Sequence, residues 1–177
     1  MASPTRTATL SIKGPEALPT AILRLHRCDE RAAAALGDAF GIEWPTRPNT
    51  VARCQALSVL WLAPTEWMIL GMPPAEAAAH ASEALGPALH HVADVTDGWA
   101  IFNIDGAQSR DLIAKGCSLD LHPRAFAADA CAQTLFAQCF AVLRRAEQEN
   151  AFQLMVDQPL AGHIQAWLAD ATADFAL

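Results

Sequence analysis

The predicted secondary structure of this chain occurs twice in the same order. Residues 21–86 and residues 99–170 each predict a strand, a helix, two strands and a second helix. The two stretches do not match residue by residue, so the repeat is one of element order only. Strands and helices in this arrangement predict an α+β fold, and their repetition indicates a duplicated unit.

End signals fix the positions of several predicted elements. Asp29 is the expected N-cap of a helix that stops at Gly41. Two apolar runs around the Pro64–Thr65 connection predict a β-hairpin. Asp157 is the expected cap of the last helix. One apolar stripe of that helix faces the core and consists of Leu160, Ile164, Trp167 and Leu168.

The prolines at the start of the chain separate an arm from a domain. Residues 1–19 contain Pro4, Pro15 and Pro19 among small polar residues, which predicts a flexible N-terminal arm with one short strand at most, at residues 8–13. The remaining residues, 20–177, are expected to form a single domain, because a chain of 177 residues fits one hydrophobic core.

Composition and charge exclude several classes of protein. The chain is 53% hydrophobic and 18% charged, which is typical of a folded globular protein. Its formal net charge of −7 opposes binding to a nucleic-acid backbone. No apolar run is long enough to span a membrane. Five cysteines without a C-x-x-C pair favour a reducing, cytoplasmic location.

The segment from Lys115 to Phe126 is unusual, because no generic core requires it. Residues 107–115 predict a short helix with Asp105 as its N-cap and Gly116 as its left-handed stop. Pro123 then favours an extended chain.

Charged side chains recur along this predicted extended arm. Asp120, His122 and Arg124 occupy every second position and would share one edge. Asp120 and His122 supply only two metal ligands, and Arg124 would repel a cation, so a metal site is not expected. A charged edge flanked by leucines instead predicts a docking surface, together with Phe126.

The chain carries no sequence motif for catalysis or cofactor binding. Neither a glycine-rich phosphate loop nor a G-x-S-x-G motif is present. Four of the five tryptophans lie in apolar elements and are expected in the core. Trp44 lies in a proline-containing loop and is the one freest to meet a partner.

Four segments of the chain together resemble a known family. They are 60–71, LWLAPTEWMILG; 94–106, DVTDGWAIFNIDG; 115–126, KGCSLDLHPRAF; and 131–138, CAQTLFAQ. In these segments the chain resembles the gamma subunit family of heterotetrameric sarcosine oxidase, and the resemblance covers roughly residues 50–170. That family is similar in fold to the folate-binding domain of the glycine-cleavage aminomethyltransferase, which implies a duplicated strand-helix-strand-strand-helix unit.

The resemblance implies a non-catalytic accessory subunit. Its partners would be the alpha, beta and delta subunits, which would bind FAD, FMN, NAD and tetrahydrofolate and oxidise sarcosine to glycine. No catalytic, cofactor-binding or metal-binding residue is expected in this chain. The expected subunit interface consists of Asp120, His122, Arg124, Phe126 and Trp44.

Two other functions remain open from the sequence. Asp94, Asp97 and Asp105 lie near predicted strand ends, and with the related fold they allow a stand-alone folate-binding or aminomethyltransferase-like protein. The other possibility is a structural domain whose partners have diverged.

Overall fold

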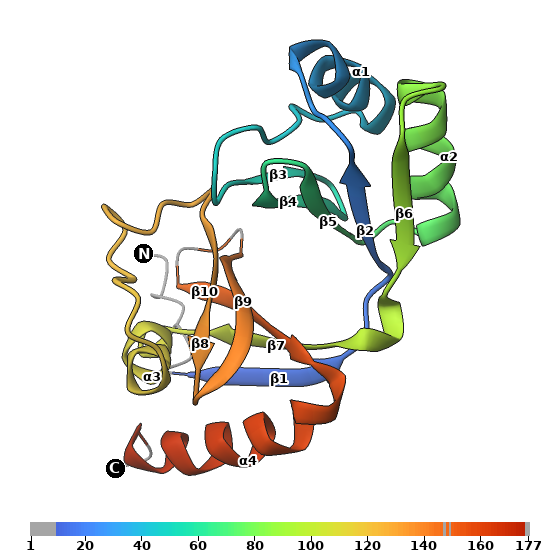
Figure 1. Cartoon of the computed structure of the whole chain (residues 1–177). Coiled ribbons are helices and arrows are strands. Elements are labelled where there is room, and N and C mark those ends of the chain that lie inside the picture. Colours follow the sequence, from blue (N-terminus) through green and yellow to red (C-terminus); the bar gives the residue numbers. More distant parts are fainter. Residues whose placement is uncertain (1–9, 147, 149, 176–177) are drawn as a thin grey trace, which may run out of the picture. The chain divides into compact units, whose positions relative to one another are not determined.

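The computed structural model describes residues 10–146, 148 and 150–175, which form two compact units (Figure 1). We call residues 17–99 and 129–132 the N-terminal unit. The C-terminal unit contains residues 10–16, 100–128 and the described residues from 133 onward. The sequence predicted one domain, whereas the chain passes from one unit to the other after residues 16, 99, 128 and 132.

The N-terminal unit is built on an antiparallel sheet with the strand order β3-β4-β5-β2-β6. Its elements in chain order are β2 (Thr20–Leu25), α1 (Glu30–Phe40), β3 (Val51–Cys54), β4 (Leu57–Ala63), β5 (Glu66–Leu70), α2 (Pro74–Leu85) and β6 (His90–Asp94). The predicted cap and stop of α1 are confirmed. Asp29 accepts a hydrogen bond from the backbone N–H of Ala32, and Gly41 has a left-handed φ of 65°.

The C-terminal unit is built on a second sheet, with the strand order β1-β7-β10-β9-β8 (Figure 1). Its elements in chain order are β1 (Ser11–Glu16), β7 (Trp99–Asp105), α3 (Ser109–Gly116), β8 (Cys131–Phe136), β9 (Cys139–Arg145), β10 (Ala151–Asp157) and α4 (Ala161–Thr172). A short 3-10 turn, η3 (Ala173–Phe175), follows α4. Leu112, Ile113 and Ile164 on the two helices are completely buried, so both helices pack on the core.

The two sheets share one topology. The order β3-β4-β5-β2-β6 corresponds to β8-β9-β10-β7-β1, and the helices α1 and α2 correspond to α3 and α4. The two corresponding edge strands differ in their place along the chain. β6 follows all the other strands of its sheet, whereas β1 precedes all the other strands of its own sheet. This correspondence confirms the predicted α+β fold with a duplicated unit.

Each half contains one strand more than the sequence predicted. β3 and β4 are joined at Gln55, which has a φ of 52°, and β8 and β9 are joined at Ala137 and Gln138, with φ of 48° and 66°. Positive φ in a tight hairpin turn is normally signalled by glycine or asparagine. These turns carry neither residue, so the pattern gave no sign that a hairpin was present.

Part of the predicted N-terminal arm is a strand. Residues 11–16 form β1, in which Ser11 pairs with Asp105, Ile12 with Ile104 and Lys13 with Asn103 of β7. β1 overlaps the short strand predicted at residues 8–13, but most of it is exposed, so it lacks the alternation of buried and exposed residues that would have fixed its bounds. Residues 1–9 of the predicted arm lie outside the described residues.

Two predicted helix caps are wrong. Asp105 lies within β7, and Gln108 occupies the N-cap position of α3 without a side-chain hydrogen bond. Asp157 makes no side-chain cap bond, and a 3-10 turn from Gln158 to Leu160 separates it from α4. In both places the chain turns before the helix begins, so the predicted cap precedes the helix by several residues.

Gly116 is not the predicted left-handed stop, because it is the last residue of α3, its φ is not positive and the chain beyond it is extended. Its role is steric. A Cβ at this position would lie 2.8 Å from Cη2 of Trp167 and 3.1 Å from Cε2 of Phe136. Those two rings meet edge to face with centroids 4.8 Å apart, so the missing side chain lets α3 approach them closely.

Replacing Gly116 with alanine should therefore destabilise the protein by about 1–3 kcal/mol, because the new methyl group overpacks the Trp167 and Phe136 rings. Gly162→Ala is the matched control, since it also lies in a helix and has no neighbour within 4 Å of an added Cβ. The control should be neutral or stabilising by up to about 1 kcal/mol. Urea unfolding measures both, and equal effects would show that Gly116 is not a packing residue.

Candidate functional site

The predicted docking segment forms a compact turn instead of an extended arm. Oδ1 of Asp120 accepts a hydrogen bond from the backbone N–H of His122 at 2.9 Å. The carbonyl of His122 then accepts from the N–H groups of Ala125 and Phe126, both at 2.8 Å. Asparagine and aspartate side chains commonly close such turns. The expected alignment of Asp120, His122 and Arg124 on one extended edge is therefore wrong, although all three residues are exposed.

Two apolar side chains fix the base of this turn. Leu121 is 5% exposed and Phe126 is 4% exposed. The Phe126 ring stacks on Phe152 with centroids 6.5 Å apart, and Nη1 of Arg145 donates to the Phe126 carbonyl at 3.4 Å. Phe126 was expected at the subunit interface, but it is a core residue. The charged turn consequently rests on a packed base.

Trp44 is also a core residue and not a free loop side chain. It is 5% exposed, and its ring lies 5.2 Å from that of Phe40 and 5.6 Å from that of Trp67, centroid to centroid. The prolines around it exclude regular structure but do not prevent the ring from reaching the core. The prolines correctly predicted a loop, but the prediction that the Trp44 side chain is exposed is wrong.

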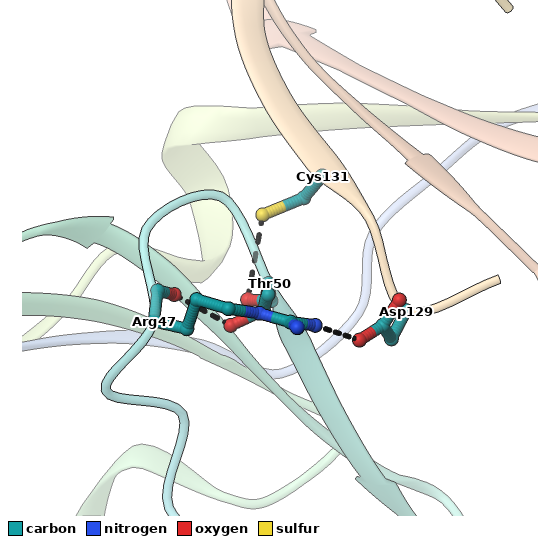
Figure 2. A network of polar contacts seen from close by, with 4 residues as sticks. All are labelled: Arg47, Thr50, Asp129 and Cys131. Atoms are coloured by element: carbon teal, nitrogen blue, oxygen red, sulfur yellow. Dashed lines mark hydrogen bonds and ion pairs between the residues drawn. The ribbon is translucent and has the colours of Figure 1, made fainter. Parts of the chain in front are cut away.

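A network of polar contacts fixes the chain just after the turn (Figure 2). Nη2 of Arg47 pairs with Oδ2 of Asp129 at 2.5 Å, and the Thr50 hydroxyl donates to the Arg47 carbonyl at 2.6 Å. Sγ of Cys131 contacts the Thr50 carbonyl at 3.5 Å. The backbone also contributes a hydrogen bond, since Val51 N–H donates to the Asp129 carbonyl at 2.7 Å. Residues 129–131 are thus held against the chain before β3 by these contacts and by an isolated β-bridge between Thr50 and Ala130.

A ladder of polar side chains crosses four strands of the C-terminal unit, from the buried Arg144 to the exposed Glu16. Nε of Arg144 donates to Oε1 of Gln153 at 2.8 Å, and Nε2 of Gln153 donates to Oδ1 of Asn103 at 2.8 Å. The amide of Asn103 donates in turn to the carboxylate of Glu16. Arg144 and Gln153 are 8% and 9% exposed. All the donors point the same way, from the guanidinium toward the carboxylate, which strengthens each bond through polarisation.

This ladder is not among the sites predicted from the sequence. Its signal was a polar residue inside an otherwise apolar strand: Arg144 follows the run AVL, and Gln153 interrupts the run AFQLMV. Such residues are rarely buried unless they are paired. Because two amides separate its charged ends, the ladder contains no adjacent acid and base that could share a proton.

Titratable groups elsewhere show the effects of local contacts. Hydrogen bonds from the backbone N–H and then the side chain of Thr96 lower the pKa of Asp94. Burial, followed by the nearby charge of Asp29, raises the pKa of the Cys28 thiol, which disfavours its reactive thiolate form. In the described part of the chain, no three His, Cys, Asp or Glu residues lie together as metal ligands.

None of the helices within the described residues has both the length and the apolar character that a bilayer crossing requires.

Similar solved structures define the class of fold. One is the heterotetrameric sarcosine oxidase from Corynebacterium sp. U-96 in complex with pyrrole 2-carboxylate, with a TM-score of 0.85 and 24% identity. That match covers 95% of this chain and 86% of the other. Another is the glycine cleavage system aminomethyltransferase T from Bartonella henselae, with a TM-score of 0.63 and 12% identity, covering 91% of this chain and 45% of the other. The fold is therefore the one predicted, similar to that of aminomethyltransferase.

Sequence comparison assigns the family. The model of the sarcosine oxidase, gamma subunit family matches residues 24–174. The sarcosine oxidase subunit gamma of Corynebacterium sp. (strain P-1) is 31% identical over 144 residues, which cover 81% of this chain and 70% of that protein. The gamma subunit of Arthrobacter sp is 29% identical over the same shares. The chain belongs to the sarcosine oxidase gamma subunit family, as the resemblance in its segments predicted.

Breaking the ladder tests whether it stabilises the C-terminal unit. Gln153→Leu removes an acceptor from Arg144 and a donor from Asn103, so unfolding should become easier by about 1–3 kcal/mol. Gln165→Leu, at an exposed position of α4, is the control and should change stability by less than about 0.5 kcal/mol. Urea titration measures the free energy of unfolding of both variants. An unchanged value for Gln153→Leu would show that the ladder does not stabilise the unit.

Proposed function

We propose that this chain is the accessory gamma subunit of a heterotetrameric sarcosine oxidase, whose partner subunits oxidise sarcosine to glycine. The family match over residues 24–174 is the observation that carries this proposal. The fold agrees with it, since 95% of the chain is similar to a chain of a heterotetrameric sarcosine oxidase. In this role the chain contributes surface and positioning, and the chemistry takes place in its partners.

The partners in this proposal are alpha, beta and delta subunits, and they hold FAD, FMN, NAD and tetrahydrofolate. The internal chemistry of this chain supports the division of labour. Its polar ladder pairs Arg144, Gln153, Asn103 and Glu16 with one another. Polar groups that satisfy each other in this way stabilise a fold and leave little capacity for a substrate.

The docking surface of this proposal is the turn that carries Asp120, His122 and Arg124. All three residues are exposed, while Leu121 and Phe126 fix the backbone beneath them. A partner that binds such a turn orders few new degrees of freedom, which lowers the entropic cost of association. Arginine is also enriched among the residues that dominate binding energy at interfaces.

The C-terminal unit also exposes an apolar pair that suits the same role. Leu135 is 61% exposed and Phe140 is 45% exposed. The two-residue turn at Ala137 and Gln138 places them opposite each other on β8 and β9. Large exposed apolar side chains are typical of interface cores, with charged residues at the rim. In the proposed complex this pair supplies the apolar contact and the turn supplies the polar one.

Substitutions in the turn test the proposal in an assembled four-subunit complex. Arg124→Ala should weaken association at least tenfold and leave the thermal unfolding of the isolated chain unchanged, because the side chain is exposed. Asp120→Asn removes the charge and keeps the oxygen that accepts from His122 N–H, whereas Asp120→Ala removes both. Comparing the two separates the effect of charge from that of turn shape.

Arg31→Ala, an exposed arginine on α1 of the N-terminal unit, is the control for loss of positive charge. Size-exclusion chromatography and a binding titration give the readout. If all the turn variants assemble as the wild type does, the docking surface lies elsewhere. Tight folate binding by the isolated chain would instead favour the stand-alone folate-binding alternative.

A further inference from the structure

The imidazole ring of His122 takes part in the hydrogen bonds that form the docking turn. Its Nδ1 atom accepts a hydrogen bond from the backbone N–H of Arg124 at 3.3 Å. Because a backbone N–H only donates, Nδ1 carries no proton in this arrangement, and the single proton of the neutral ring is on Nε2. The turn therefore contains a hydrogen bond that exists only while His122 is neutral.

His122 is the residue that holds the turn together around Arg124. Its backbone N–H donates to Oδ1 of Asp120 at 2.9 Å, and its carbonyl accepts from Ala125 and Phe126, both at 2.8 Å. The ring adds the contact to the Arg124 backbone. Arg124 itself is exposed, so the direction of its guanidinium depends on the backbone that His122 fixes.

A proton on Nδ1 would oppose this arrangement in two ways. It would face the Arg124 N–H, so that two donors meet without an acceptor. It would also add a positive charge to a turn that already carries Arg124 and that rests on Arg145 of β9, which contacts the Phe126 carbonyl. The carboxylate of Asp120 is the one negative group within the turn, and it would attract the imidazolium in competition with the existing contact.

We propose that His122 makes the docking turn sensitive to pH, and that the chain associates with its partner subunits in the form in which His122 is neutral. This inference rests on the docking function proposed for the turn. Histidine is the side chain whose charge ordinarily changes between pH 5 and 8. The acceptor on Nδ1 is present at the upper end of that range and is lost on protonation, so association is strongest near pH 8 and weakens as the pH falls.

Two substitutions of His122 separate its charge from its role as an acceptor. His122→Asn does not titrate and keeps an acceptor, because the side-chain oxygen of asparagine can take the place of Nδ1. His122→Gln has its amide one bond further out and lacks an acceptor at that place. In a binding titration of the assembled four-subunit complex, the dissociation constant should rise between about pH 8 and about pH 5.5. That rise should be at least about fivefold greater for the wild type than for His122→Asn, whereas His122→Gln should bind weakly at both pH values.

The isolated chain gives a readout that does not depend on docking. Nuclear magnetic resonance should detect a scalar coupling across the hydrogen bond between the Arg124 backbone nitrogen and Nδ1 of His122 near pH 8, and the coupling should be lost near pH 5.5. The proposal is overturned if no coupling is present near pH 8. It is also overturned if the wild type and His122→Asn have the same pH dependence while Arg124→Ala weakens assembly. Normal assembly of Arg124→Ala would overturn the docking function itself, which the coupling in the isolated chain does not test.

Discussion

The pairing of β1 with β7 is the constraint on which the C-terminal unit depends. It joins Lys13 to Asn103, ninety positions later in the sequence, and makes β1 the edge of the sheet. Without β1 this sheet would lack the strand that corresponds to β6, and the polar ladder would lose its terminal carboxylate, Glu16. Ile12 and Gly14 of the same strand also line a hollow beside α4. One short, largely exposed strand thus completes three features of the unit.

The features that the sequence predicted correctly depend on local signals. Asp29 and Gly41 bound α1 as expected, and the hairpin of β4 and β5 follows from two apolar runs around a proline-containing turn. Local energetics decide such features, so a single stretch of sequence contains enough information. The duplicated fold followed because the same local signals recur in the same order.

The errors have a common physical cause, which is tertiary context. Gln55, Ala137 and Gln138 turn tightly without glycine, so two strands were missed. Gly116 allows the close packing of Trp167, a residue fifty-one positions away, and does not have the left-handed conformation that was expected. Trp44 and Phe126 were expected at the surface but fill cores, because distant rings of Trp67 and Phe152 accept them. The ladder depends on three pairs of neighbouring strands, and no local sequence pattern specifies which strands pair.

In the proposed complex, this chain supplies stable structure and a docking surface, and its partner subunits oxidise sarcosine. The most direct measurement is to purify the chain alone and also after capture of its tagged form from its own organism, and to compare flavin absorption and sarcosine-dependent peroxide formation. The account predicts both signals in the captured complex and neither in the chain alone. Flavin retained by the isolated chain, or sarcosine oxidised by it, would contradict the account.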